Sequence, residues 1–296
     1  MMIKPMKKKK KVDFFIVVGL VLLLIYSISF LTPLIWSFIT AFKEEIEFME
    51  NKFALPSSIN FDNYVTAFKT IKVPIMENGR SYQIYSIEMI FNSLSYSLLS
   101  TITHTITPCI TAYAVAKLDV KFGRVIYMIV IVTMVLPIIG NLASEIQVSK
   151  ALGLFDNMFG LAIMKGHFLG SNFLIFYAAF KGIANDFSEA AYLDGASELN
   201  VLTKVSLPLI KTTISAIALL SFISYWNDYT TPMVYLPTKP TIAYGLYVFN
   251  QSTTNASNFL TVRIAGCMLV SIPIFIVFMF TKNKLIGNLS FGGIKG

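Results

Sequence analysis

Long stretches of mostly apolar residues constrain the fold of this chain more than any other feature of its sequence. Residues 14–39 carry no charge, and about 20 apolar residues in a helix cross the hydrocarbon core of a bilayer, which is about 30 Å thick. Five further stretches follow at residues 89–116, 125–144, 158–180, 212–236 and 264–281. The fourth is the weakest, because residues 166–180 are too short to cross alone and its helix must begin near Met158. We therefore predict an all-α, polytopic membrane protein with six transmembrane helices.

The composition supports this membrane assignment. Charged residues make up 14% of the chain, against roughly 25% in soluble domains, which argues against an ordinary soluble enzyme or a disordered protein. The net charge of +8 could suggest a nucleic-acid partner, but Lys4 and Lys7 to Lys11 stand just before the first apolar stretch. Such a cluster orients a protein in the membrane, so no nucleic acid is expected. Cys109 and Cys267 lie in apolar sequence without a partner motif, so neither a disulfide framework nor a metal site is expected.

The distribution of lysine and arginine predicts which segments face the cytoplasm. With both termini inside, the cytoplasmic segments hold 15 of the 24 basic residues. Five of the others lie in the long first outside loop, where this rule carries less weight. The predicted order is a basic cytoplasmic tail (1–13), a first transmembrane helix (14–39), an extracytoplasmic loop (40–88), a membrane core (89–281) that includes a cytoplasmic loop (181–211), and a cytoplasmic tail (282–296).

The cytoplasmic loop at residues 181–211 is the most informative segment. Asp186, followed three residues later by Glu189, is typical of a capping box that starts a helix. Gly195 permits a sharp exit from that helix or a close backbone approach, and a second short helix is expected from Ser197. Pro208 stands where the next membrane helix begins, and its missing N–H is harmless in a first turn. Two short helices joined at a glycine, with small side chains on one side, predict a docking element for another protein.

This loop resembles a motif of a known family. Glu189-Ala190-Ala191, followed by Gly195 and by Val205-x-Leu207-Pro208, is similar to the "EAA" loop of ABC importer permeases, where isoleucine stands at the position of Val205. Asp194-Gly195-Ala196 and the segment from Tyr225 to Tyr229 are similar to the carbohydrate-uptake branch of that family. The likeness extends to the Gly-x-Ile-Lys-Gly end at residues 292–296 and so covers nearly the whole chain. The chain thus resembles the smaller membrane subunit of a maltose-type, binding-protein-dependent importer.

The resemblance implies a type I ABC importer permease fold and a mechanism of alternating access. A short coupling helix would sit in a cleft of a cytoplasmic ATPase, in a contact that involves Glu189, Ala190, Ala191, Asp194, Gly195, Ala196, Leu207 and Pro208. Glu189 is either a helix cap alone or also a contact with the ATPase. The implied partners are an ABC ATPase dimer, a second homologous permease in a heterodimer, and an extracytoplasmic sugar-binding protein. The implied location is the plasma membrane of a bacterium.

No cofactor is expected in this chain itself. The sequence contains no Gly-x-x-x-x-Gly-Lys-Ser/Thr phosphate loop, so ATP and Mg are expected on the ATPase. No nucleophile elbow appears either. The chain is therefore expected to be a transport subunit without catalytic or metal-binding residues.

The candidate residues of the substrate pathway are Asn141, Glu145, Tyr225, Trp226, Asn227 and Asp228. Asp228 is the only acidic residue of an otherwise apolar stretch, where charges are usually functional. Its aromatic and amide neighbours suit a sugar, although Asp228 could equally lie at the outer water boundary with Trp226 in the interfacial aromatic belt. Glu145 could line a cavity or simply belong to a helix end.

Two other classes of protein remain as alternatives. A proton-coupled secondary transporter could use His104, Asp228 and Glu145 as a relay, but such carriers typically show two repeated halves, and no convincing repeat is present. An intramembrane enzyme would need a second aspartate at a matching depth. A helix–helix hydrogen bond explains His104 more simply, and snorkelling at the outer boundary explains Lys165 and His167.

Overall fold

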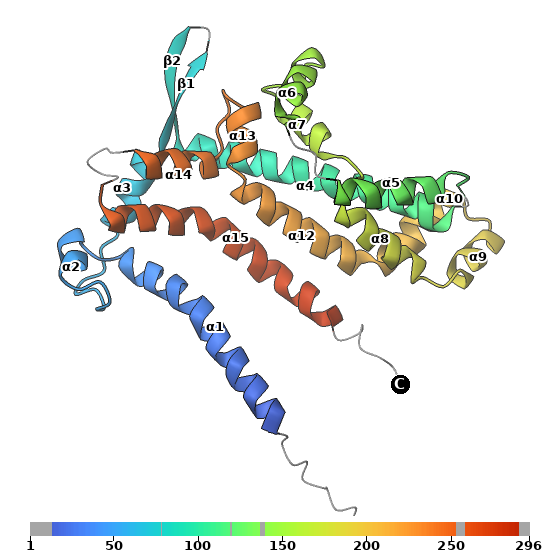
Figure 1. The fold of residues 1–296 in the computed structure, drawn as a ribbon, viewed down its shortest axis with the longest axis horizontal. Coiled ribbons are helices and arrows are strands. Elements are labelled where there is room, and N and C mark those ends of the chain that lie inside the picture. Colours follow the sequence, from blue (N-terminus) through green and yellow to red (C-terminus); the bar gives the residue numbers. More distant parts are fainter. Residues whose placement is uncertain (1–13, 78, 119, 137–139, 253–257, 290–296) are drawn as a thin grey trace, which may run out of the picture. The chain divides into compact units, whose positions relative to one another are not determined.

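The computed structural model describes residues 14–77, 79–118, 120–136, 140–252 and 258–289 (Figure 1). The described chain is mostly helical, which confirms the all-α prediction, and it adds one small sheet that the sequence did not predict. The tail predicted at 1–13 and residues 290–296 of the tail predicted at 282–296 lie outside the described residues. The chain divides into two compact units, Met1–Ala67 with Thr254–Met268 and Phe68–Thr253 with Leu269–Gly296.

The first unit contains the first predicted membrane helix and the start of the outside loop. Helix α1 (Phe14–Thr40) is apolar, and its side chains are almost all exposed, as expected for a helix surrounded by lipid. Two short helices follow, α2 (Glu45–Glu50) and α3 (Asp62–Thr70). The outside loop therefore begins as a folded element rather than as an extended linker.

Polar contacts hold this part of the loop together. The buried ammonium of Lys43 donates to the carbonyl of Asn51 at 2.9 Å, and the amide of Asn63 donates back to the carbonyl of Lys43 at 2.7 Å. The Glu45 carboxylate accepts from the backbone N–H and the hydroxyl of Thr261. Thr261 lies in the first turn of α15 (Leu260–Leu289), where a carboxylate satisfies N–H groups that have no partner within the helix.

A β-hairpin follows in the second unit. Strands β1 (Lys72–Glu77) and β2 (Arg80–Tyr85) pair antiparallel, with Val73 opposite Ile84. Val73 and Ile84 are buried while their neighbours along the strands are exposed, which is the alternation of a strand with one covered face. Gly79 occupies the turn with φ +75°, a conformation that glycine adopts readily.

Helix α4 (Ser86–Lys117) is the central helix of the second unit. It packs against α7 (Met158–Lys165), α8 (Ser171–Lys181), α12 (Lys211–Asn227) and α14 (Ile242–Gln251). Its buried side repeats every three or four residues, as a helix face should, and includes Met89, Ser93, Tyr96, Ser100, Thr105, Cys109, Ala112 and Ala116. Many of these side chains are small, which lets helix backbones approach closely where lipid removes the hydrophobic driving force between helices.

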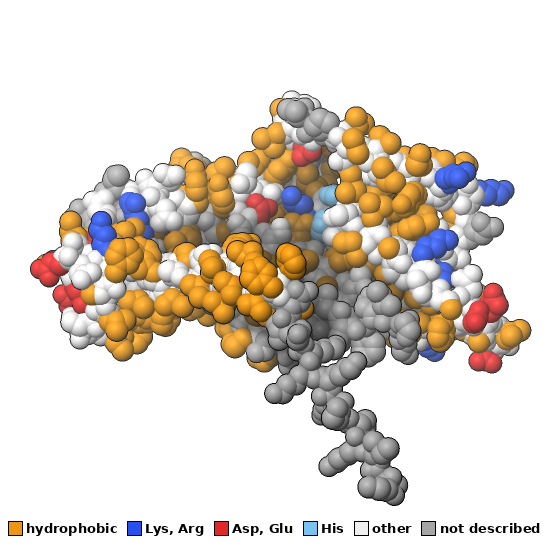
Figure 2. All heavy atoms as spheres, turned by 60° about the horizontal axis from the view of Figure 1, so that its bottom comes forward, with side chains coloured by type: hydrophobic (Ala, Val, Ile, Leu, Met, Phe, Trp, Pro, Cys, Tyr) orange, Lys and Arg blue, Asp and Glu red, His pale blue; other side chains and the backbone are white. Residues whose placement is uncertain are grey.

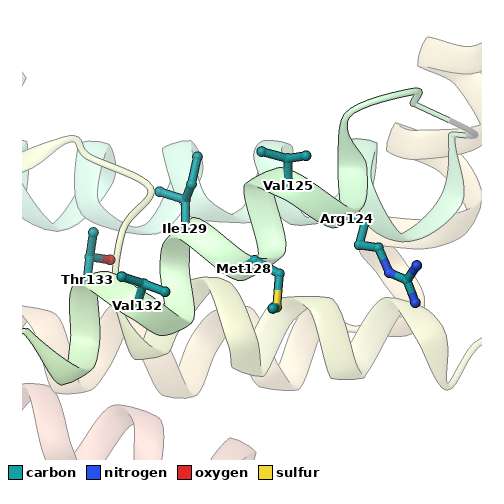
Figure 3. A pocket seen from close by; sticks show the side chains of 6 residues that line it. All are labelled: Arg124, Val125, Met128, Ile129, Val132 and Thr133. Carbon is teal, nitrogen blue, oxygen red and sulfur yellow. The ribbon is translucent and has the colours of Figure 1, made fainter.

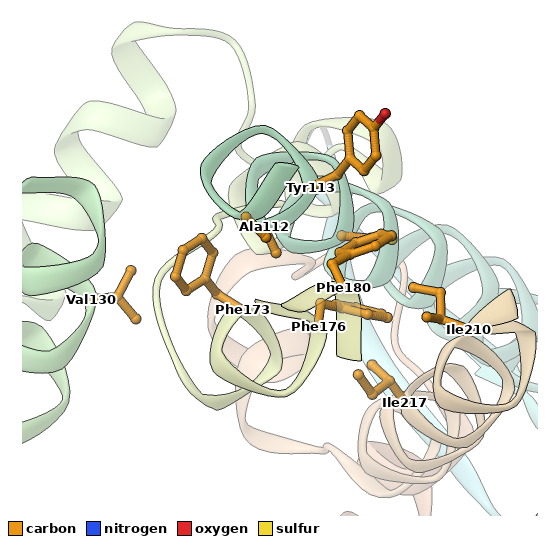
Figure 4. Close-up of a cluster of buried hydrophobic side chains, with 10 residues drawn as sticks. Ala112, Tyr113, Val130, Phe173, Phe176, Phe180, Ile210 and Ile217 are labelled. Carbon is orange, nitrogen blue, oxygen red and sulfur yellow. The ribbon is translucent and has the colours of Figure 1, made fainter. Parts of the chain in front are cut away.

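A large apolar cluster of this unit lies along the C-terminal half of α4 (Figure 4). Phe173, Phe176 and Phe180 lie on one face of α8 and are fully buried. They meet Tyr113 of α4 and Ile217 of α12 in the same cluster. This cluster fixes α8 and α12 against α4, and it therefore also fixes the two ends of the loop that connects α8 to α12.

Three of the predicted membrane segments are divided into separate helices in the structure. The stretch at 158–180 breaks between α7 and α8, where Gly170 has φ +120°. The stretch at 212–236 breaks at Asp228, between α12 and α13 (Thr230–Tyr235). The stretch at 125–144 contains α5 (Gly123–Val135), which ends at Leu136 because this residue precedes a proline and is extended. Helix α6 (Leu142–Ala151) then starts separately.

Two described helices are long and apolar enough to cross a membrane, namely α1 and residues Leu260–Thr281 of α15. A third candidate is the pair Glu198–Leu209 and Lys211–Asn227, whose two helices are bent by 76°. Hydrophobic side chains make up much of the surface seen in Figure 2, which is typical of a membrane-facing protein. The count of six membrane crossings remains a prediction from the sequence.

Candidate functional site

The loop at residues 181–211, which the sequence predicts to be cytoplasmic, forms two short helices joined at a glycine, as predicted. Helix α9 (Asp186–Leu193) ends in a Schellman motif, in which the N–H of Gly195 bonds to the carbonyl of Tyr192 and the N–H of Ala196 to that of Ala191. Gly195 has φ +80°, a conformation that is costly for most other residues. Ser197 then precedes α10 (Glu198–Asn200), which continues as the π-helical turn η1 (Val201–Ser206) and α11 (Leu207–Leu209).

The predicted capping box at the start of α9 is absent. Asp186 is the first residue of the helix rather than its cap, and Asn185 precedes it without a side-chain capping bond. The Asn185 side chain instead accepts a hydrogen bond from the Lys117 ammonium at 2.9 Å. The Glu189 side chain is exposed, so capping does not account for its position.

The other predicted coupling residues are either exposed or half-buried. Ala190, Asp194, Gly195 and Pro208 are exposed, whereas Ala191, Ala196 and Leu207 are half-buried. No residue of α9 is buried. Two large apolar side chains of α9 are also exposed, Leu193 by 89% and Phe187 by 55%. The sequence analysis did not single out these two residues, although an apolar side chain on a short surface helix is a usable signal.

Asp228, the acidic residue predicted in the substrate pathway, bridges two helices. It ends α12 and precedes α13, and its Oδ1 accepts from the backbone N–H of Thr231 at 3.0 Å. Its Oδ2 accepts from the hydroxyl of Tyr96 on α4 at 2.9 Å. Both carboxylate oxygens therefore have protein partners, and Asp228 acts as a cap for α13.

The neighbours of Asp228 point in different directions. Trp226 is 1% exposed, and its indole N–H donates to the Val270 carbonyl of α15 at 3.0 Å, so it is packed inside the protein. Asn227 is exposed and donates to the carbonyl of Ile223 on its own helix. Tyr225 packs edge-on against Tyr96, with ring centroids 5.6 Å apart. The structure therefore does not bring these residues together in one aromatic cluster.

Glu145 lines a polar pocket of about 350 Å³. Its carboxylate accepts from the hydroxyl of Tyr235 at 2.9 Å and from the amide of Asn141. The pocket is lined by Glu145, Leu161, Met164, Lys165, His167, Thr231 and Tyr235. These residues come from α6, α7, α13 and the segment before α8, so the broken helices supply its walls.

Lys165 and His167 form the basic side of this pocket, which was not predicted from the sequence. The ammonium of Lys165 donates to the Thr231 hydroxyl at 3.3 Å, whereas the sequence suggested a snorkelling lysine. His167 lies with its ring centroid 5.6 Å from that of His104, and Figure 2 shows the histidines close together. His104 contacts the carbonyl of Lys165 at 3.2 Å through Nδ1, which confirms the helix–helix hydrogen bond predicted for it.

Two of the further cavities in the second unit differ in their lining. One of about 240 Å³ contains His104, Asn172, Ser221, Ser224 and Tyr225 among its lining residues. The other, of about 390 Å³, follows α5 and is lined by Arg124, Val125, Met128, Ile129, Val132 and Thr133 (Figure 3). Its lining is mainly apolar and comes from one helix, so it lacks the converging polar groups of a ligand site. Within the described residues no group of His, Cys, Asp and Glu could hold a metal ion.

Comparison with known proteins identifies the family. The model of the family described as "Binding-protein-dependent transport system inner membrane component" matches residues 109–286, which include both the loop at residues 181–211 and Asp228. The chain belongs to this family. It is therefore a membrane-embedded transport component and not an enzyme, and any ATPase of such a system is a separate subunit.

The matches to similar proteins cover nearly the full length of this permease and of its relatives. It is 27% identical to the probable starch degradation products permease AmyC of Thermoanaerobacterium thermosulfurigenes, over 92% of this chain and 94% of the relative. It is also 27% identical to the trehalose permease SugB of Mycobacterium tuberculosis, over 90% and 93% of the two chains. A chain in the crystal structure of a bacterial ABC transporter that imports the acidic polysaccharide alginate is 25% identical, with a TM-score of 0.72 over 95% of this chain and 99% of that one. The fold is that of ABC importer permeases.

Proposed function

We propose that this permease is one of two membrane subunits of an ATP-driven, binding-protein-dependent importer of sugars or oligosaccharides. The named relatives transport starch degradation products, trehalose and arabinooligosaccharides, which supports a carbohydrate substrate. The second subunit would be a homologous permease, so that the two chains enclose a pathway as a heterodimer. Both termini would face the cytoplasm of a bacterium, and a sugar-binding protein would dock on the outer side.

The exposure of the cytoplasmic loop is the observation that carries this proposal. Helix α9 buries none of its residues against the rest of the chain, yet it carries Leu193 and Phe187 on its surface. Exposed apolar side chains rimmed by acidic ones are typical of a protein–protein contact. An ATPase cleft would cover them, together with Glu189 and the backbone at Gly195. ATP and Mg would bind to that ATPase, and its closure would move the loop.

The polar pocket beside α13 suits the transport of a sugar. Carboxylate, ammonium, imidazole and hydroxyl groups converge there from several helices, and sugar hydroxyls both donate and accept hydrogen bonds. Tyr235 adds an aromatic ring, whose face packs against sugar C–H groups. We infer that Glu145, Lys165 and His167 face the transported molecule at one stage of the cycle.

Co-purification tests the coupling role. The tagged permease would be purified in mild detergent from its native host, and the bound proteins identified by mass spectrometry. We expect an ABC ATPase and a second permease with the wild type. The substitution Leu193→Glu should lower the recovered ATPase by about tenfold or more, as loss of a central apolar contact does.

A matched control places the same charge elsewhere. Met76 is 70% exposed on β1, far along the chain from the loop, so Met76→Glu should leave ATPase recovery unchanged. The second permease should be recovered with both variants. A wild-type permease without any ATPase, or equal losses with the two variants, would contradict the proposed coupling surface.

A further inference from the structure

Two side chains of helix α4 contact the loop at residues 181–211, which we call the coupling loop. Tyr113 and Lys117 are one helical turn apart and so share a face of α4. Residue Tyr113 is 3% exposed. Its hydroxyl lies 3.5 Å from Oε2 of Glu198. The ammonium of Lys117 donates to the carbonyl of Ile183 at 2.6 Å and to the side chain of Asn185 at 2.9 Å. One helix turn of α4 therefore contacts both the beginning and the middle of the loop.

Glu198 connects the two helices of the loop to each other. It is the first residue of α10, and the same oxygen that meets Tyr113 accepts from the hydroxyl of Tyr192 on α9 at 2.8 Å. Desolvation, followed by the hydrogen bond to Glu198, raises the pKa of Tyr192, so its hydroxyl keeps its proton and donates at neutral pH. Hydrogen bonds to an ionised carboxylate are among the stronger ones in proteins.

Helix α4 also carries side chains of the substrate pathway. Tyr96 bonds to Asp228, and His104 lines the pocket that contains Tyr225. Tyr113 and Lys117 lie on the same continuous helix. Packed helices can carry a displacement from one site to another when both ends are held by specific contacts.

We propose that Tyr113, Tyr192 and Glu198 form a clamp that positions both helices of the coupling loop on α4, with Lys117 as a second anchor. The clamp residues are positioning residues: they transmit the movement of the loop to α4 without contacting ATP or the transported molecule. This inference rests on the proposed function of the loop. A purely local role of Glu198, as an acid at the start of a helix, does not explain why a buried tyrosine of α4 is directed at it.

The test measures transmission without knowledge of the substrate. In a chain with Cys109→Ala and Cys267→Ser, the substitution Ser224→Cys places a thiol in the pocket beside His104. The complete complex in nanodiscs would be labelled with a water-soluble maleimide, with and without Mg-ATP and vanadate. We expect nucleotide to change the labelling rate in the otherwise wild-type complex. Glu198→Leu should reduce that change by about tenfold, the factor for a lost charge-assisted hydrogen bond, while the ATPase still co-purifies.

Matched variants separate positioning from general damage. Glu198→Gln keeps an oxygen that accepts from the tyrosines and should restore part of the nucleotide effect. Glu77→Leu removes an exposed acid from β1, outside the loop, and Tyr127→Phe removes a hydroxyl from α5; both should behave as the wild type. The proposal is overturned if Glu198→Leu keeps the full nucleotide effect with the ATPase bound, or if Glu77→Leu loses as much.

A second measurement keeps this proposal distinct from the proposed function. Amide hydrogen exchange of the permease alone in nanodiscs reports the clamp even if no ATPase binds. Exchange at residues 188–196 should be faster in Glu198→Leu and Tyr192→Phe than in Glu77→Leu. Equal exchange in all three variants would show that the clamp does not hold the loop.

Discussion

Asp228 illustrates how a single charge in an apolar segment can serve the fold itself. Its two oxygens satisfy the first turn of α13 and the hydroxyl of Tyr96. An unpaired carboxylate at this place would be costly, whereas a paired one ends α12 and starts α13 at a defined residue. The hydrogen bonds of the Asp228 carboxylate thus account both for the interruption of the helix and for the presence of a charge at this position.

Replacement of Asp228 should therefore destabilise the permease. For Asp228→Ala we expect a loss of about 1–2 kcal/mol, because an N-cap contributes about 1 kcal/mol and an interhelical hydrogen bond in a membrane about 0.6 kcal/mol. The buried thiol of Cys109 offers the measurement: in a Cys267→Ser background, a thiol-reactive dye reports unfolding on heating. Asn227→Ala is the neighbouring control and should change the midpoint little, because Asn227 bonds only within α12. Equal shifts for both variants would contradict the capping role.

Residue identities in the sequence indicated the chemistry near Asp228 but not its geometry. Trp226, Asn227 and Asp228 are adjacent in the chain, yet successive side chains on a helix point about 100° apart. The ring of Trp226 therefore enters the protein toward Val270, while Asn227 faces outward. Lys165 and His167 join Glu145 only because α6 and α7 are separate helices, which a hydropathy pattern does not reveal.

At the scale of elements, the loop between α8 and α12 is the part that the sequence predicted best. Its two short helices and the glycine turn between them follow from local rules of helix termination, although the capping box predicted at Asp186 and Glu189 is absent. The sequence placed Asp228 inside the stretch at 212–236, where the break occurs, but the apolar composition on both sides of a break does not show that two separate helices form. The hairpin of β1 and β2 was missed because six-residue strands in a polar loop give a weak signal.

Gly195 allows a test of the loop's backbone that is separate from its contacts. A side chain at this position would meet no atom within 4 Å, so only its φ of +80° restricts substitution. Gly195→Val should strain the turn by about 1–2 kcal/mol and lower the recovery of the ATPase. Gly195→Asn should be tolerated, because asparagine enters the left-handed region more readily. The measurement is co-purification of the ATPase, with total permease yield as the reference.

The two substitutions at Gly195 are matched in size, so comparing them separates a steric effect from an effect on the backbone. Both add a side chain of similar size to an open position, so a steric block to the ATPase would affect them equally. A loss confined to Gly195→Val would show that the backbone turn matters. Equal losses would instead show that the partner covers the surface at Gly195, and the conformation of the turn would then not be what limits ATPase binding.

For the whole molecule, the side of the membrane on which each segment lies is predicted from where the lysines lie. The predicted order places residues 52 and 151 outside and residues 121 and 200 inside. Only α1 and α15 meet the length and hydropathy of a single membrane helix among the described elements. Helix α4 together with the interrupted segments of α5, α7 and α8 must then supply the three crossings between residues 52 and 200.

Cysteine accessibility can count these crossings directly. In a background without Cys109 and Cys267, each of the exposed positions Lys52, Lys121, Ala151 and Asn200 would be replaced by cysteine in turn. A membrane-impermeant maleimide should label positions 52 and 151 in intact cells, and positions 121 and 200 only in inverted vesicles. Labelling of position 151 from the cytoplasmic side, with position 200 also inside, would mean that neither the segment of α5 and α6 nor that of α7 and α8 crosses the membrane. The chain would then cross four times instead of six, the loop at residue 200 would remain inside, and the ATPase contact would stand while the predicted topology would fall.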